Sequence, residues 1–259
     1  MNFFMVSNYL EASILALIQG FSEFIPVSSS AHLILVSKIS SFNLGSLQLD
    51  ICLHLGSLIA ILFYFRKDII NLFQNRPLVV LLILGSVPLV LIGFIFHLSG
   101  FVNNFRSLEV IAWTTLIFAL VLYFADKQKI EKNLTNDLTI KNVLIIGFFQ
   151  VLAIIPGVSR AGITITASRL LNFNRVDSSK IAFYLSIPAL SGASVLGIKD
   201  LFEENIKFDL VFIFATFLSF VFSYLTIKYF LIFVKKFSLK FFVYYRIFLA
   251  LILFYIIYF

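Results

Sequence analysis

The feature that most constrains the fold of this chain is a series of long apolar runs. A helix needs about 20 apolar residues to cross the hydrocarbon core of a membrane, and six runs come close to this length or exceed it, each bounded by charged or turn-forming residues. These runs are 47–65, 77–98, 107–124, 181–198, 209–234 and 241–259. The strict alternation expected of a membrane β-barrel does not occur in the sequence. The chain is therefore predicted to be an all-α polytopic membrane protein.

Composition supports the same class. The chain is 61% hydrophobic and 13% charged, with a mean hydropathy of +1.03, whereas soluble domains are roughly half apolar and a quarter charged. This excludes a soluble fold. The basic residues behind the net charge of +7 lie in short loops, where anionic lipid headgroups explain them better than nucleic acid does. Cys52, the single cysteine, is interpreted as a core residue, and no cleaved targeting peptide is expected.

Basic residues also predict which loops face the cytoplasm, because lysine and arginine are enriched on that side. Three loops are rich in them and are expected inside. Their basic residues are Arg66, Lys67 and Arg76; Lys127, Lys129, Lys132 and Lys141; and Lys235, Lys236 and Lys240. The alternate loops are expected on the outer side of the membrane, together with both termini. One of these loops contains Asn103 and Arg106, and the other contains Lys199 and Lys207.

Two further apolar stretches, 9–37 and 143–171, are broken by prolines. Pro26 stands beside a serine cluster, and Pro156 is followed by Gly157. Because each of these prolines stands among further turn-forming or polar residues, with Ser159 and Arg160 following Gly157, neither stretch is predicted to cross the membrane as a straight span. With the sides of the loops fixed as above, each stretch must enter the membrane and return, and the two enter from opposite faces.

The two halves of the chain share this plan, since each broken stretch is followed by three apolar runs. Aligning the two prolines places Ser29 on Ser159 and Ser30 on Arg160. Such a pattern is typical of an inverted repeat, in which the functional site lies where the broken helices meet near the middle of the membrane.

We therefore predict one membrane domain over residues 1–259, with repeat halves of about 1–124 and 141–259. It contains about six transmembrane helices and two re-entrant helix hairpins. The two proline turns are the expected place of the functional site.

The first turn carries several polar side chains. Gln19 and Glu23 are four residues apart, which places them on one face of a helix. Pro26 ends that half-helix, and either Ser28 or Ser29 can cap the start of the next one. A carboxylate, several hydroxyl groups and the imidazole of His32 are thus expected to gather on one buried turn.

A histidine, His32, comes shortly after the same turn in the sequence. His32 shares a helix face with Ser29 at a spacing of three, so the pair could act as nucleophile and base. The alternatives are that His32 is a satisfied core histidine and that the serines bond to helix carbonyls. His54 and His97 have no comparable neighbours in the sequence and are interpreted as core or interfacial residues.

The second turn predicts an anion site. Ser159 and Arg160 stand at a helix start, where free backbone N–H groups and the helix dipole favour an anion, and the arginine fork suits phosphate. Ionisable groups at membrane depth are usually functional or paired. An anion site beside Glu23 suggests a phosphate with a divalent cation. The alternative is that Glu23 and Arg160 are a structural ion pair.

The residues at the two turns resemble the motifs of a known family. Residues 19–32 resemble the (E/Q)-x-x-x-E motif followed by P-V-S-S-S-x-H, and residues 156–164 resemble the P-G-x-S-R-x-G-x-T motif. Both belong to the undecaprenyl-diphosphate phosphatase family, also called the bacitracin-resistance family. The resemblance to this family covers nearly the whole chain. Three departures affect metal affinity and fine geometry: Gln19 where many members have Glu, Ala31 for a common Gly and Ala161 for a common Ser.

The resemblance implies a multi-pass enzyme of the bacterial inner membrane. It would hydrolyse undecaprenyl diphosphate to the monophosphate and so recycle the lipid carrier of cell-wall (peptidoglycan) synthesis, which confers bacitracin resistance. The site would open to the outer side and use Mg²⁺ or Ca²⁺. The expected partners are the isoprenoid diphosphate substrate and membrane lipids, with no nucleic acid and with a homodimer left open.

The resemblance also implies a role for each motif residue. The implied catalytic residues are Glu23, Ser29, His32 and Arg160. The implied substrate-binding residues are Ser28, Ser30, Gly157, Ser159 and Thr164. The implied metal ligands are Glu23 and Gln19. In this scheme Ser29 is the nucleophile or a phosphate ligand, His32 is the general acid/base, and Arg160 with Ser159 clamps the diphosphate.

Two other functions compete with this one. Inverted repeats with broken helices are typical of secondary transporters, so a transporter or lipid flippase with an anion site is the main alternative. A purely structural membrane subunit is the other, and it leaves Glu23, His32 and Arg160 unexplained. The sequence leaves open the choice between a phosphoserine intermediate and direct attack by water, the substrate tail length, and whether the protein also flips lipid.

Overall fold

The computed structural model describes residues 3–39, 47–74, 76–100, 104–203 and 209–259. Within these ranges the chain is helical and forms no β-strand beyond one isolated bridge. The helices are α1 (Phe3–Ser22), α2 (Ser29–Ile39), α3 (Leu47–Tyr64), α4 (Arg66–Gln74), α5 (Arg76–Ser99), α6 (Leu108–Asp126), α7 (Leu134–Asp137), α8 (Ile140–Val151), the 3₁₀ turn η2 (Leu152–Ile154), α9 (Arg160–Leu170), α10 (Arg175–Glu203), α11 (Leu210–Lys236) and α12 (Lys240–Tyr258).

All six predicted apolar runs are helices, namely α3, α5, α6, α10, α11 and α12. Five of them are long and apolar enough to cross a membrane, whereas the apolar part of α3, Gln48–Tyr64, is shorter. Large apolar side chains such as Phe148 and Phe217 are exposed, as expected where lipid is the solvent. The all-α membrane class is confirmed, and the number of spans stays a prediction. Cys52 is buried in α3, as expected of a core residue.

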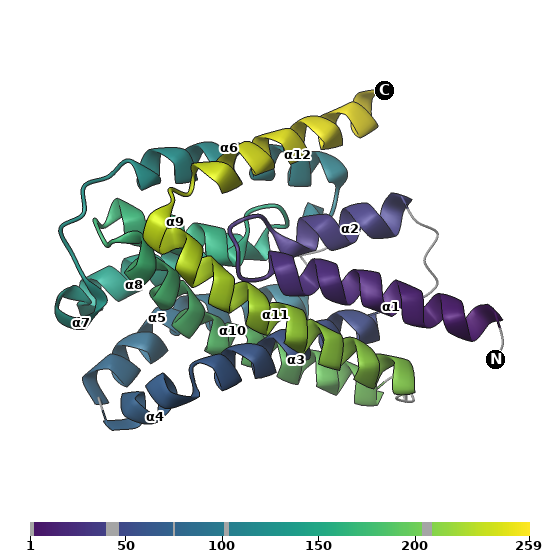
Figure 1. The fold of residues 1–259 in the computed structure, drawn as a ribbon, viewed down its shortest axis with the longest axis horizontal. Coiled ribbons are helices and arrows are strands. Elements are labelled where there is room, and N and C mark those ends of the chain that lie inside the picture. Colours follow the sequence, from purple (N-terminus) through teal and green to yellow (C-terminus); the bar gives the residue numbers. More distant parts are fainter. Residues whose placement is uncertain (1–2, 40–46, 75, 101–103, 204–208) are drawn as a thin grey trace.

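The ends of the helices sort the loops into two groups. Figure 1 shows α1 starting and α12 ending at one end of the molecule, while α4, α7 and the connection from α11 to α12 lie at the other end. The three loops rich in lysine and arginine therefore share one end, which agrees with their predicted common side. Which end faces the cytoplasm stays a prediction, and Asn103 and Lys207 lie outside the described residues.

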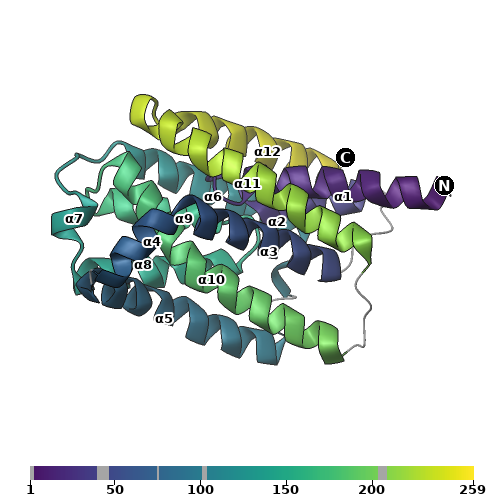
Figure 2. The ribbon, with the colours of Figure 1, turned by 60° about the horizontal axis from the view of Figure 1, so that its bottom comes forward.

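The two broken stretches form helix–turn–helix units. α1 and α2 meet at the turn 23–28, and α8 and α9 meet through η2 and the turn 155–159. Figures 1 and 2 show these units extending inward from opposite ends of the molecule. Their neighbours correspond, since α1 packs on α11 as α8 packs on α5, and α3 pairs with α10 as α6 pairs with α12. Re-entry from two membrane faces and the repeat halves stay predictions.

Glycines allow the closest helix crossings. A Cβ atom on Gly147 in α8 would lie 2.2 Å from the carbonyl oxygen of Gly85 in α5. A Cβ on Gly56 in α3 would lie 2.4 Å from the carbonyl oxygen of Thr216 in α11. Small residues let helix backbones approach closely in membranes, where packing replaces much of the hydrophobic driving force. These crossings set the distance between the helices around the two turns.

A buried charge cluster joins four elements at the end that carries α7. Asp126, at the end of α6, accepts hydrogen bonds from Nε and Nη2 of Arg175 at 2.6 and 3.0 Å and from the backbone N–H of Leu239 at 3.1 Å. Arg169 of α9 lies 3.8 Å from the same carboxylate and donates to the carbonyl of Phe173. The cluster ties α6, α9, α10 and the start of α12 together.

Candidate active site

The first turn is shaped by the start of α2. Ser28 has a φ of +80°, a conformation that non-glycine residues rarely adopt. Its hydroxyl accepts a hydrogen bond from the backbone N–H of Ala31 at 3.4 Å. Of the two predicted caps, Ser28 therefore caps α2 and leaves Ser29 as the first helical residue. The hydroxyl of Ser29 is then free to point toward Glu23.

The second turn has the same form. Ser159 has a φ of +70°, and its hydroxyl accepts from the N–H of Gly162 at 3.1 Å. Gly157 has a φ of +92°, and a Cβ there would lie 2.1 Å from Oγ1 of Thr114. The turn thus needs glycine at this position, both for its conformation and for its contact with α6. Arg160 becomes the first residue of α9.

A buried arginine supports this turn from α12. Nη2 of Arg246 donates to the carbonyls of Gly157 and Val158 at 2.9 and 3.2 Å, and its side chain is fully buried. It thereby fixes the backbone that leads into Ser159. No sequence motif pointed to this residue.

The two caps correct the alignment predicted from the prolines. The equivalent residues are Ser28 and Ser159, which share the positive φ and the capping bond, so Ser29 corresponds to Arg160. The predicted alignment of the two turns was therefore shifted by one residue. The reason is local: the second turn contains one more residue between its proline and its cap than the first turn does.

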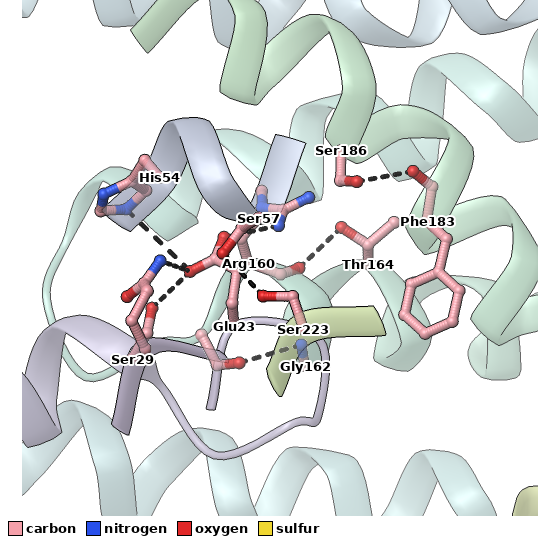
Figure 3. Close-up of polar contacts among 12 residues, drawn as sticks. Glu23, Ser29, His54, Ser57, Arg160, Gly162, Thr164, Phe183, Ser186 and Ser223 are labelled. Atoms are coloured by element: carbon pink, nitrogen blue, oxygen red, sulfur yellow. Dashed lines mark hydrogen bonds and ion pairs between the residues drawn. The ribbon is translucent and has the colours of Figure 1, made fainter. Parts of the chain in front are cut away.

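The carboxylate of Glu23 joins the two turns. Its Oε1 accepts from Nη2 of Arg160 at 2.6 Å, and its Oε2 accepts from the hydroxyl of Ser29 at 2.7 Å and from Nε2 of Gln19 at 3.0 Å. Glu23 is buried, and Arg160 is mostly buried. Figure 3 shows Ser29 and Arg160 converging on Glu23 from different elements. The predicted convergence of these three side chains is present.

A cavity of about 810 Å³ opens onto this cluster. Polar groups of both turns line it, and α3, α5, α10 and the 104–107 segment supply the remaining wall. Its polar and charged lining includes Glu23, Ser28, Ser29, Ser30, Asp50, His54, His97, Arg106, Ser159 and Arg160. Its apolar lining includes Leu89, Val90, Phe94, Leu190, Val195 and Leu196. This size and mixture suit a ligand with a polar head and an apolar tail.

Four predicted site residues are not among those that line the cavity: Gln19, His32, Gly157 and Thr164. Thr164 is buried and donates to the carbonyl of Arg160 at 2.8 Å, so it steadies the first turn of α9. Gly157 serves the conformation of the second turn. The contacts of Thr164 and Gly157 are with the protein framework.

His32 contacts its own turn and α12, and it does not contact Glu23 in any described hydrogen bond or ion pair. Its Nδ1 is 2.6 Å from the carbonyl oxygen of Ser28, and its Nε2 is 2.6 Å from the hydroxyl of Tyr245. The ring stacks on Tyr245 with 8° between the planes. The expected contact with Ser29 is not formed in this structure. Apo geometry alone does not exclude an acid/base role, so that role stays a prediction.

His54 of α3 takes the place near Glu23 that was expected for His32. Its Nε2 lies 4.0 Å from Oε2 of Glu23, and its side chain is about a third exposed to the cavity. The interpretation of His54 as a core or interfacial residue therefore missed a cavity residue. The signal available in the sequence was Asp50 and His54, four residues apart on one face of an apolar helix.

The site could hold a cation only with help from a ligand. Among the described residues, no three His, Cys, Asp or Glu side chains cluster as a metal site. However, the buried Oε1 of Gln19 meets no hydrogen-bond donor within the described part of the chain, and an unsatisfied buried oxygen is costly. The Gln19 amide donates to Glu23 through Nε2, so a half-turn of the amide would bring this oxygen to the carboxylate. The pair would then fit a hard cation whose other ligands are phosphate oxygens and water.

Known proteins resemble the chain over nearly its whole length. A family model described as bacitracin resistance protein BacA matches residues 12–252. An undecaprenyl-diphosphatase of Pelagibacter ubique is 53% identical over 255 residues, which is 98% of this chain and 100% of the relative. Proteins of the same name from Saccharophagus degradans and Elusimicrobium minutum are each 40% identical, over 96% and 94% of this chain and 98% and 96% of their own lengths.

Proposed function

The chain belongs to the bacitracin resistance protein BacA family, and we propose that it hydrolyses undecaprenyl diphosphate to undecaprenyl phosphate and inorganic phosphate. One observation of the site supports this most strongly: the hydroxyl of Ser29 and the guanidinium of Arg160 both bond to Glu23 on the wall of one cavity. The reaction recycles the lipid carrier of cell-wall synthesis and confers bacitracin resistance. We place the enzyme in the bacterial inner membrane with its site open to the outer side.

The two turns bind the diphosphate of the substrate. Arg160 offers a fork of donors matched to phosphate oxygens, and the free N–H groups at the start of α9 add the positive end of a helix dipole. Hydroxyls of Ser28, Ser30 and Ser159 line the same cavity. Apolar residues of α5 and α10 on its wall can accept the first isoprene units while the rest of the tail stays in lipid. These groups also stabilise the charge that develops as the phosphoryl group transfers.

Attack begins at Ser29 or at a water beside it. The 2.7 Å hydrogen bond from the Ser29 hydroxyl to Glu23 leaves a carboxylate ready to accept the proton of the attacking group. Ser29 can then form a phosphoserine, or it can orient a water for direct attack. His32 can join only if its ring leaves Tyr245 when substrate binds.

A divalent cation, Mg²⁺ or Ca²⁺, is part of this proposal. Glu23 and the unsatisfied oxygen of Gln19 would hold it together with phosphate oxygens of the substrate, so it binds mainly when substrate is present. When bound, it supplies charge neutralisation to the diphosphate. The residues of the chain still orient the substrate and move the proton.

Phosphate release by the purified protein tests the proposal against the transporter or flippase. The protein in detergent is given an isoprenoid diphosphate, and inorganic phosphate is measured with and without a chelator. We expect multiple turnovers that stop with chelator and resume with added Mg²⁺ or Ca²⁺, while the melting temperature stays unchanged. Ser86→Ala is a matched serine control, because Ser86 bonds only to the carbonyl of Leu82 among the described contacts. Substrate binding without phosphate release would favour the transporter or flippase.

A further inference from the structure

We propose that His54 is a proton-transfer residue of this site, exchanging protons with Glu23 and with the phosphate oxygens of the bound lipid. The inference rests on the proposed function and adds a residue to it. The imidazole groups near the two turns are those of His32 and His54. Only one of them lies beside the carboxylate that binds Ser29 and Arg160.

The tautomer of His54 is set by its own helix. Nδ1 lies 2.7 Å from the carbonyl oxygen of Asp50, and a carbonyl can only accept a hydrogen bond, so Nδ1 carries the hydrogen. In the neutral ring Nε2 then carries a lone pair. This atom lies on the side of Glu23, 4.0 Å from its Oε2. Figure 3 shows the His54 ring directed at the carboxylate.

The position of His54 connects Glu23 to the cavity. Oε2 of Glu23 is the atom that receives the Ser29 hydroxyl, and the same oxygen is the one nearest to His54. A separation of 4.0 Å is closed by a small rotation of the ring or by one bridging water. About a third of the side chain is exposed on the cavity wall. His54 can thus meet a bound phosphate on one side and the buried carboxylate on the other.

His32 differs in each of these respects. Both of its ring nitrogens lie within 2.6 Å of polar partners, the Ser28 carbonyl and the Tyr245 hydroxyl. It is not among the residues that line the cavity. Without rearrangement, the imidazole available to the carboxylate is that of His54.

The attacking hydroxyl, from Ser29 or from water, forms a bond to the terminal phosphorus. The bond from that phosphorus to the bridging oxygen breaks, and the isoprenoid monophosphate leaves with the electron pair. The proton of the attacking hydroxyl passes to Glu23 and then to Nε2 of His54, which donates it to the bridging oxygen. If a phosphoserine forms, water attacks it, the proton of the water returns through Glu23 to Ser29, and phosphate is released.

The test compares His54→Gln and His54→Ala with the wild type, using isoprenoid diphosphate as the substrate. Removal of a general acid/base lowers rates about 10²- to 10⁴-fold. We therefore expect kcat to fall at least about 100-fold in both variants, with little change in KM and in melting temperature. Imidazole added to His54→Ala should restore part of kcat. It should not restore Arg160→Lys, which serves as the control for specificity.

Each outcome decides the proposal. A His54→Gln variant with near-normal kcat overturns it. A large loss in folded His54→Ala that imidazole does not rescue also overturns it and leaves His54 a structural residue. The wild type is assayed first: if it releases no phosphate, the proposed function fails, whereas an active wild type with an active His54→Gln variant refutes this inference alone.

Discussion

At the scale of single residues, Glu23 connects the two turns. It was predictable from the sequence, together with Ser29 and Arg160, because a carboxylate, a hydroxyl and an arginine at broken helices in apolar surroundings have few purely structural uses. Their meeting follows from the two proline turns facing each other. His54 was not identified in this way, since a histidine within an apolar run usually belongs to the core, and its spacing of four from Asp50 was the one signal beside it. Arg246 was missed although an arginine inside the apolar run 241–259 is itself a signal. Its partners are backbone carbonyls, which no motif reveals.

Cation dependence is the first prediction at this scale. Gln19→Glu adds an anionic ligand beside Glu23, so the Mg²⁺ or Ca²⁺ concentration for half-maximal activity should fall. Glu23→Gln removes the only carboxylate of the pair, so that concentration should rise steeply or activity should vanish. Titration of phosphate release against each cation measures both effects.

The structural alternative gives a different pattern. If Glu23 only neutralises Arg160, which it contacts at 2.6 Å, Glu23→Gln lowers the melting temperature, and Gln19→Glu leaves the cation curve unchanged. Unchanged curves in both variants with activity intact would remove Glu23 from the site.

At the scale of elements, the prolines predicted where the broken helices turn, and the structure has turns at both places. The register between the turns was wrong by one residue. Positive φ values at Ser28 and Ser159 determine the caps, and serine, unlike glycine, gives no sequence signal for that conformation. The boundaries of five predicted runs were close to those observed because charged residues flank them, whereas α10 extends beyond the predicted 181–198 at both ends, to Arg175 and Glu203.

Close packing of α8 on α5 leads to the second prediction. Gly147→Ala places a Cβ 2.2 Å from the carbonyl oxygen of Gly85, so the helices must separate. Overpacking of this kind costs about 1 to 3 kcal/mol, and the melting temperature in detergent should fall clearly.

Gly93→Ala in α5 is the matched control for this packing effect. A Cβ at Gly93 meets no heavy atom within 4 Å, and alanine favours helix more than glycine does. Its melting temperature should therefore be equal or higher. Equal melting temperatures for Gly147→Ala and wild type would show that the crossing of α5 and α8 is not tight.

At the scale of the whole molecule, the alternation of basic loops predicted the grouping of the helix ends seen in Figure 1. The all-α membrane class followed from hydropathy alone, because a spanning helix must satisfy its own backbone in lipid. The orientation, the re-entrant hairpins and a homodimer are properties of the protein in its membrane. They stay predictions that labelling and mass measurement in membranes can test.

Orientation is the third prediction. A cysteine introduced at Asn104, which is exposed between α5 and α6, should react with an impermeant reagent in intact cells. A cysteine at Lys129, exposed after α6, should react only after lysis. The native Cys52 is buried and should contribute little background. Labelling of the two positions in the opposite order would reverse the orientation and place the active site on the inner side.

The central claim is that the two turns together form one phosphate-transfer site, and the most direct test is kcat for phosphate release by Arg160→Lys. Lysine keeps the positive charge that balances Glu23 but loses the bidentate fork. We expect the variant to insert and fold with a melting temperature near that of the wild type, while kcat falls by about 100-fold or more, as when a preorganised donor is removed from a reaction site. Near-normal turnover of the folded variant would contradict the account and reduce Arg160 to a structural partner of Glu23.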